Sequence, residues 1–184
     1  LLNGSIVTVD GSRGEVYLGS RIKIEKKEII LKKPLNKKTA TKLYVNLAEP
    51  ERAKEIAKKN VEGVGLLRAE FMIADIGIHP KEAIKQKKQD KFIDKLTHDL
   101  EIFCEAFHPR PVVYRATDFK TNEYRALPGG EAWEPEEPNP MLGFRGAYRY
   151  VANPEVFTLE LNAIKKTREK YDNLWLMVPF VRSP

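Results

Sequence analysis

The feature that most constrains this chain is an order of elements that repeats from Leu43 onward. Each unit has a short apolar run rich in branched residues, then a polar loop, then a stretch whose apolar residues recur at helical spacing. The four runs are Leu43–Leu47, Val64–Leu67, Val112–Tyr114 and Leu174–Val178. Strands that alternate with helices form parallel sheets, so the pattern predicts an α/β fold with the helices outside the sheet.

Three helices are predicted between or after these runs. The first begins at Pro50, the second begins after Pro80 and is stopped by Pro109, and the third begins after Pro154. Their apolar faces are expected to contain Ala53, Ile56 and Ala57 in the first, Phe92, Ile93, Leu96, Leu100, Phe103, Cys104 and Phe107 in the second, and Phe157, Leu161 and Ile164 in the third.

Two architectures fit this alternation. A doubly wound open sheet binds its ligand beside a Gly-rich first turn, but Gly63-Val64-Gly65 lacks the third glycine and precedes its strand. A (β/α)8 TIM barrel takes about 250 residues and places its chemistry on the loops that follow the strands. We therefore expect residues 39–184 to form part of a barrel, with about four strand–helix units.

The first 38 residues have a different character. Residues 1–20 predict a β-hairpin, and two strands do not fold alone, so we expect this hairpin to belong to another domain. Between Arg21 and Lys42 there are nine Lys or Arg and two Glu, a local charge of +7 in a chain whose net charge is +6. Residues 21–38 therefore predict a solvated linker or a surface for an anionic partner, and the remainder has no basic character that would indicate nucleic-acid binding.

The sequence indicates neither a membrane protein nor a disulfide-stabilised one. Its apolar runs are short, as in the five residues Leu174–Val178, whereas a bilayer span needs roughly 20. The single cysteine, Cys104, cannot build a disulfide framework. The first residues carry no secretory signal, so we expect a cytoplasmic protein with no membrane partner.

Arginines stand where the predicted strands end. Arg68, Arg115 and Arg182 follow three of the apolar runs, and Arg145 lies between Gly143 and Gly146. A guanidinium group donates two parallel hydrogen bonds to a phosphate or carboxylate, and the glycines would let backbone N–H groups approach the same ligand. Any one of these arginines can be an ordinary surface residue, but several at one rim predict an anionic ligand.

The 27 residues Ala116–Leu142 show no clear apolar period and make an unusually long connection. This interval is either a functional loop or a tolerated surface loop. It contains side chains able to orient a polar substrate, namely Asp118, Lys120, Asn122, Glu123 and Arg125. The histidines, His79, His98 and His108, lack the spacing of metal ligands, and Cys104 falls on a predicted apolar face, so neither indicates a metal site or a nucleophile.

Three strings occur in a fixed order: GVGLLRAEF at residues 63–71, YRATDFKTNEYR at 114–125 and NPMLGFRG at 139–146. They resemble successive signatures of the PEP-utilising enzymes, a family that includes phosphoenolpyruvate (PEP) synthases, pyruvate phosphate dikinases and enzyme I of the sugar phosphotransferase system. The central string and PFVR at 179–182 resemble the synthases most. Residues 6–17 resemble the last hairpin of the family's swivelling phosphohistidine domain.

The resemblance implies a domain order and a reaction. Residues 1–20 would end the swivelling domain, residues 21–38 would be a basic linker, and residues 39–184 would form the N-terminal half of the PEP- and pyruvate-binding barrel. The implied activity is that of a pyruvate, water dikinase, in which a phosphohistidine passes its phosphoryl group to pyruvate at Mg²⁺ while ATP becomes AMP and phosphate. Arg68 and Arg115 match the family's substrate-binding arginines, Arg145 matches its third arginine motif, and Asp118 and Asn122 are expected nearby.

The rest of the family's machinery is expected outside these residues. The phosphohistidine, the magnesium ligands, the proton-donating cysteine and the ATP-binding domain all lie elsewhere in the family, and Cys104 is not that cysteine. We therefore expect no catalytic residue and no metal ligand here, and no turnover by this chain alone. Open apolar strand edges predict a homo-oligomer. The alternatives are a pyruvate phosphate dikinase or enzyme I and, from another class, a non-catalytic module that holds a polyanion.

Overall fold

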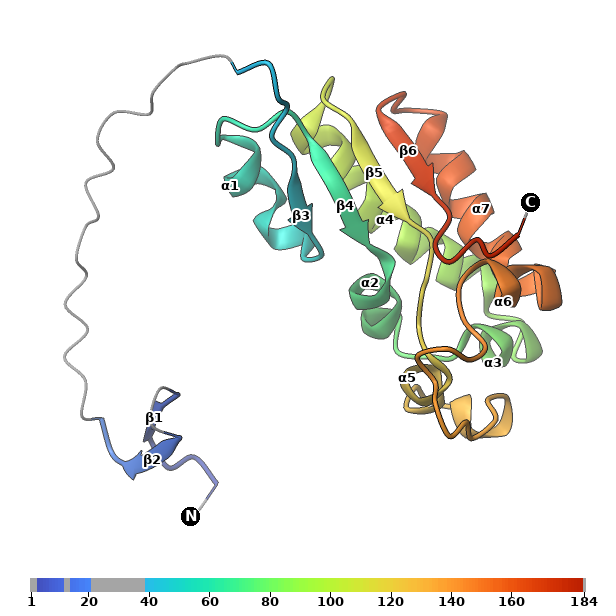
Figure 1. Cartoon of the computed structure of the whole chain (residues 1–184), viewed down its shortest axis with the longest axis horizontal. Coiled ribbons are helices and arrows are strands. Elements are labelled where there is room, and N and C mark those ends of the chain that lie inside the picture. The colour runs from blue at the N-terminus through green and yellow to red at the C-terminus, as the bar shows by residue number, and fades with distance from the viewer. Residues whose placement is uncertain (1–2, 12–13, 21–38, 184) are drawn as a thin grey trace. The chain divides into compact units, whose positions relative to one another are not determined.

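The computed structural model describes residues 3–11, 14–20 and 39–183 (Figure 1). The chain forms two compact units, Leu1–Thr39 and Ala40–Pro184. The basic segment predicted as a linker, residues 21–38, lies outside the described residues. In the part that is described, no helix is both long and apolar enough to cross a membrane.

The first unit contains the predicted hairpin. Strands β1 (Val7–Asp10) and β2 (Glu15–Leu18) pair antiparallel, with Val7 opposite Leu18. The hydroxyl of Thr8 donates a hydrogen bond to the carbonyl of Gly19 at 2.7 Å. Most apolar side chains of the hairpin are exposed, including Leu18 at 71%, so the two strands bury little surface of their own.

The second unit is built on a parallel sheet in the order β3-β4-β5-β6. The strands β3 (Val45–Leu47), β4 (Val64–Arg68), β5 (Val112–Arg115) and β6 (Leu174–Met177) coincide with the four apolar runs. At the start of β4, Gly63 has φ +148°, and a Cβ there would collide with the carbonyl oxygen of Pro111. That oxygen accepts the N–H of Val64 at 2.9 Å, so glycine is required for β4 and β5 to pair at this point.

The helical elements are a 3₁₀ turn (Pro50–Arg52), α1 (Ala53–Ala57), α2 (Ala69–Ile76), α3 (Pro80–Lys85), α4 (Gln89–Phe107), α5 (Thr121–Arg125), a second 3₁₀ turn (Gly130–Ala132), α6 (Ala147–Ala152) and α7 (Pro154–Arg168). The single helix expected between Pro80 and Pro109 is two helices. They separate where Lys87 takes a left-handed conformation, with φ +56°. Helix α2 begins directly after β4 and was not predicted.

The core lies between the sheet and helices on one of its faces. Figure 1 shows α4 and α7 behind the strands, and α4 packs on β5 while α7 packs on β6. All seven residues predicted for the apolar face of the second helix are buried in α4. Leu67, Tyr114 and Leu174 point into this core and are fully buried. By contrast, Trp175 in β6 is 61% exposed, so the other face of the sheet is not covered to the same extent.

Helix α7 presents a different face from the predicted one. Ile164 is buried as expected, but Leu161 is 38% exposed, and Leu159 is buried in its place at 5%. The buried face includes the small residues Ala163 and Thr167, which let α7 approach α4 closely. A pattern of large apolar residues alone does not identify a face made partly of small ones.

The two leucines provide a matched test of this orientation. We expect Leu159→Ala to lower the free energy of unfolding by about 2–4 kcal/mol, because it leaves a cavity in the core, and Leu161→Ala to lower it by less than about 1 kcal/mol. Urea denaturation of the two variants measures both values. A larger loss for Leu161→Ala than for Leu159→Ala would mean that α7 is turned as the sequence pattern suggested, and equal losses would contradict the orientation that the structure shows.

A buried carboxyl group connects α7 to the end of β5. Glu160 is 2% exposed and accepts hydrogen bonds from the hydroxyl of Tyr114 at 2.8 Å and from the N–H of Thr117 at 3.0 Å. Burial raises the pKa of Glu160, because the charged form loses its hydration, and the two hydrogen bonds only partly offset this. Compared with the unfolded chain, the folded protein therefore shifts this side chain toward its protonated form.

This raised pKa gives a stability difference that depends on pH. The contribution of a protonated Glu160 is fully present below the unfolded pKa, about 4.3, and is lost as pH rises through the folded pKa. Glu160→Gln keeps an acceptor of the same shape without the charge. We expect the variant to be more stable than the wild type at pH 8, with the difference vanishing near pH 4. Urea denaturation at several pH values measures this, and a difference independent of pH would contradict it.

Candidate functional site

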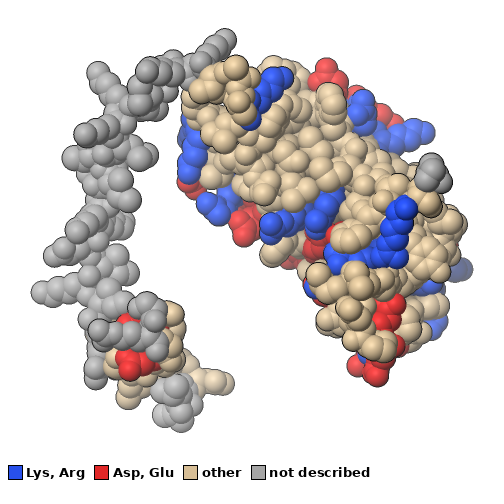
Figure 2. All heavy atoms as spheres, in the orientation of Figure 1, with Lys and Arg blue, Asp and Glu red and all other residues tan. Residues whose placement is uncertain are grey.

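A pocket of about 450 Å³ lies at the carboxyl ends of β4 and β5. Figure 2 shows Lys and Arg side chains gathered beside Asp and Glu across this end of the sheet. Four cations and three carboxylates line the pocket, so its formal charge is +1. These side chains are Arg68, Arg115, Lys120, Arg145, Glu70, Asp118 and Glu123.

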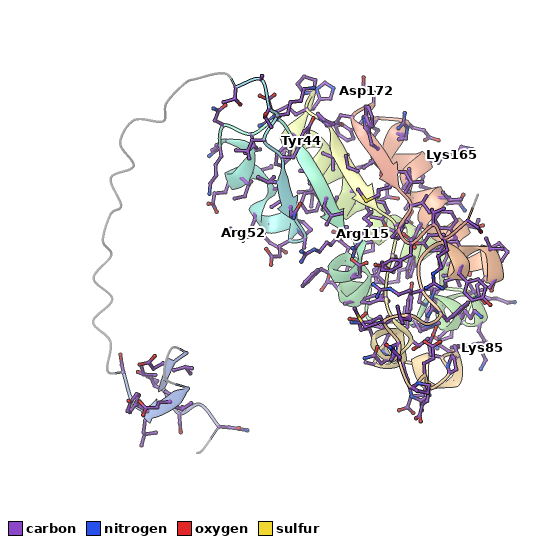
Figure 3. The ribbon with its side chains drawn as sticks, viewed as in Figure 1. Tyr44, Arg52, Lys85, Arg115, Lys165 and Asp172 are labelled. Carbon is purple, nitrogen blue, oxygen red and sulfur yellow. The ribbon has the colours of Figure 1, made fainter. Side chains whose placement is uncertain are left out.

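Two of the predicted arginines are direct neighbours at this rim. Arg68 ends β4 and Arg115 ends β5, and the two residues are paired in the parallel register. Figure 3 shows Arg115 at the end of its strand, beside α2. Arg115 donates from Nη2 to Oε1 of Glu70 at 2.9 Å. Arg68 is exposed and has no ion-pair partner among the described residues, so its guanidinium is free for a ligand.

The third arginine of the pocket is held by a carboxylate. Arg145 donates from Nε and Nη2 to the two oxygens of Asp118, at 2.9 and 2.8 Å, and lies 4.2 Å from the ring centre of Phe180. The hydrogen bonds to Asp118 raise the pKa of Arg145 above its ordinary value. The N–H of Asp118 itself donates to Oε1 of Glu70 at 2.7 Å. Carboxylates therefore fix the positions of both Arg115 and Arg145.

Protein groups fill the space around the two glycines that flank Arg145. A Cβ at Gly143 would collide with the carboxylate of Glu137, which accepts the N–H of Phe144 at 3.0 Å. Gly146 has φ +59°, and a Cβ there would lie 2.7 Å from the Cβ of Phe180. The glycines therefore let this loop pack closely against other parts of the chain, whereas the sequence suggested that they let backbone N–H groups approach a ligand.

A buried ion-pair cluster anchors the long interval between β5 and α6. The carboxylate of Glu134 accepts from Arg149 at 2.6 and 2.9 Å and from Nε2 of His79 at 2.9 Å. Nδ1 of His79 accepts the N–H of Lys81, so Nε2 carries the proton given to Glu134. Burial alone would raise the pKa of Glu134, but the hydrogen bonds from His79 and Arg149 outweigh it and lower the pKa. Contacts with Arg149 of α6 and with His79, at the start of α3, therefore hold this interval in place.

The remaining residues predicted from the sequence lie at different places. Lys120 and Glu123 pair at 3.0 Å beside the pocket. Asn122 is exposed on α5 and is not among the residues that line the pocket. Arg125 donates to the carbonyl of Glu134 at 3.0 Å, and Arg182, in the segment after β6, donates to the carbonyl of Gly143 at 3.1 Å.

Glu70 is the site residue that sequence reasoning missed. It lies two residues after Arg68, within the first of the three strings. The available signal was its place two residues after an arginine that ends a predicted strand. Its partners, Arg115 and Asp118, are more than forty residues away in the chain, so their contact was not visible in local spacing.

The described residues give no support to metal binding or thiol chemistry. Among them, no group of three or more His, Cys, Asp or Glu side chains is placed to hold a metal ion. Cys104 is fully buried, and burial raises the pKa of its thiol to about 12. The thiol therefore stays protonated at neutral pH and is a poor nucleophile.

A larger hollow, of about 590 Å³, borders α2 and α4 but is unsuited to an anion. Carboxylates outnumber cations on its walls: five acidic side chains face it, with only Lys54 and His98 to oppose them. The acidic side chains are Glu49, Glu51, Asp75, Asp99 and Glu105. Of the two hollows, the one at Arg68 and Arg115 has the charge that an anionic ligand requires.

Known proteins resemble this chain over nearly its whole length. The "probable phosphoenolpyruvate synthase" of Staphylothermus marinus is 46% identical over 200 aligned residues, which cover 98% of this chain and 24% of that protein. The phosphoenolpyruvate synthase of Pyrococcus furiosus is 46% identical over 195, covering 100% of this chain and 24% of the relative. The "probable phosphoenolpyruvate synthase" of Methanocaldococcus jannaschii is 43% identical over 190, covering 100% of this chain and 16% of the relative.

The chain thus spans about a quarter of the length of the first two relatives. The family model described as "PEP-utilising enzyme, PEP-binding domain" matches residues 23–184, a range that includes the whole parallel sheet and the pocket at its carboxyl end. On this match, and on the identities above, the chain belongs to the PEP-utilising enzymes and contains sequence of their PEP-binding domain.

Proposed function

We propose that this chain is the PEP- and pyruvate-binding part of a phosphoenolpyruvate synthase, a pyruvate, water dikinase. That enzyme would convert ATP, pyruvate and water into PEP, AMP and phosphate through a phosphohistidine. One observation carries the proposal: guanidinium groups from two adjacent strand ends, Arg68 and Arg115, share a pocket with Arg145. The identity of 46% to two relatives named as synthases favours this activity over that of a pyruvate phosphate dikinase or enzyme I.

The arrangement suits phosphoryl transfer, which depends on positioning and charge neutralisation more than on covalent chemistry by the protein. We propose that Arg68 and Arg115 bind the phosphoryl and carboxylate groups of the substrate. Arg145 would add a third guanidinium, with Asp118 fixing its orientation through two hydrogen bonds. Asn122, exposed on α5, stays a prediction without a contact to the pocket.

We also propose that residues 39–184 are the N-terminal half of a (β/α)8 barrel, that residues 1–20 end a swivelling phosphohistidine domain, and that residues 21–38 connect them. The strand order, which follows the chain order, supports the barrel. So does the uncovered face of the sheet, where Trp175 is 61% and Met177 38% exposed, because parallel sheets are normally covered on both faces. The unpaired outer edges of strands β3 and β6 would also favour a homo-oligomer.

We place the magnesium ion of this reaction outside the chain. The described residues do not fit it, since they offer no group of three ligands and the carboxylates of Glu70 and Asp118 are already bonded to arginines. A pocket with a formal charge of +1 neutralises only part of a phosphorylated acid. The phosphohistidine, the proton-donating cysteine and the ATP-binding domain would also lie elsewhere, so we expect the chain alone to make no PEP.

Removing both arginines at the strand ends should greatly weaken anion binding. We expect Arg68→Ala combined with Arg115→Ala to weaken PEP binding by about 100-fold or more, because two charge-assisted contacts are lost. Isothermal titration of the 184-residue chain with PEP measures this. Arg52→Ala is the matched control, since Arg52 is an exposed arginine of the first 3₁₀ turn outside the pocket, marked in Figure 3.

Two outcomes would count against the proposed function. Equal affinities for PEP in the wild type and the double variant would show that the pocket is not the PEP site. PEP synthesis from ATP and pyruvate by the purified chain would show that the machinery we place elsewhere is present here.

A further inference from the structure

Glu70 occupies a special position among the arginines of the pocket. It lies in the first turn of α2, two residues after Arg68, and its Oε1 accepts hydrogen bonds from Nη2 of Arg115 at 2.9 Å and from the N–H of Asp118 at 2.7 Å. The side chains of Glu70 and Arg115 are only 14% and 23% exposed, so water screens this pair poorly. Within the pocket, Glu70 is therefore the hydrogen-bonded counter-anion of Arg115, while Oδ2 of Asp118 lies further away, 3.7 Å from Nη1 of Arg115.

The pair between Glu70 and Arg115 uses only part of its hydrogen-bonding capacity. Oε2 of Glu70 and Nε of Arg115 are both buried and have no hydrogen-bond partner among the described residues. Arg145, by contrast, meets both oxygens of Asp118 in a two-point contact. A single-point pair with a spare donor is easier to exchange for another oxyanion than a two-point pair. Arg115 is therefore the paired arginine that a ligand can take over.

We propose that Glu70 sets the affinity of this pocket by acting as the counter-anion of Arg115 when no ligand is bound. An oxyanion ligand would bind the free Arg68 and then take over Arg115 from Glu70. This inference rests on the proposed function, in which the pocket holds PEP and pyruvate.

The two states give Glu70 opposite effects on energy. Without a ligand, its charge stabilises a largely buried guanidinium, which would be costly to leave unpaired. With a ligand, the same negative charge lies within the pocket that holds a second anion and repels it. Glu70 therefore stabilises Arg115 in the empty pocket but lowers the affinity for a bound anion. The same repulsion aids the release of a phosphorylated product.

The test is the variant Glu70→Gln, which keeps the acceptor oxygen for Arg115 and Asp118 and removes only the charge. We expect the 184-residue chain with this change to bind PEP about tenfold more tightly by isothermal titration, because one near repulsion is lost. Inorganic phosphate should also gain affinity. Pyruvate, with less negative charge, should gain less than PEP, a dependence on ligand charge that a merely structural role would not produce.

Two control variants separate the effect of the negative charge of Glu70 from other effects of the substitution. Glu55→Gln makes the same neutralisation at an exposed position on α1 outside the pocket, and should leave the PEP affinity unchanged. Glu70→Asp keeps the charge but shortens the side chain, and should bring no tenfold gain. Thermal melting by circular dichroism confirms that each variant is folded.

The results separate this inference from the proposed function. If the wild type binds PEP and folded Glu70→Gln binds it no more tightly, or if Glu70→Asp gains as much, the affinity-setting role is wrong and the PEP site stands. If neither the wild type nor Glu70→Gln binds PEP or phosphate, the proposed function is wrong and this inference with it.

Discussion

Two positive charges on neighbouring residues of a parallel sheet repel each other, and the site is organised around how that repulsion is offset. The pairing of β4 with β5 places Arg68 beside Arg115. Glu70 lies at the start of α2 and Asp118 lies just after β5, so carboxylates reach the arginines from both sides. Glu70 also accepts the backbone N–H of Asp118, and the carboxylate of Asp118 also accepts from Arg145. The shape of the pocket therefore depends on this balance of charge.

Much of the fold could be predicted because it follows from local apolar patterns. The four strands coincide with apolar runs, and all the apolar residues on the buried face of α4 were predicted, although Thr97 and Asp99 are buried there too. The apolar patterns gave the wrong helix boundary or the wrong buried face where a backbone conformation or a small residue determines it. The break between α3 and α4 depends on a left-handed Lys87, and the orientation of α7 depends on the small residues Ala163 and Thr167.

The site was predictable only in part, for a related reason. An arginine after a strand is visible in the sequence, and the parallel sheet then brings Arg68 and Arg115 to one rim. The interval from Ala116 to Leu142 showed no apolar period because buried ion pairs hold it, above all that of Glu134 with Arg149. Such pairs join distant residues and leave no periodic pattern, so neither this cluster nor the contacts of Glu70 could be inferred from residue spacing.

The near balance of charge in the pocket has a consequence for how a ligand arrives. Three of its four cations are already paired within 3.0 Å, so their fields largely cancel beyond about 8 Å, the screening length of physiological salt. An acid that binds this pocket, as we propose, is therefore drawn in only weakly from a distance. Under the proposed function, discrimination among small acids would occur after contact, through the fit of oxygen atoms to guanidinium groups, and capture rates would vary little with salt.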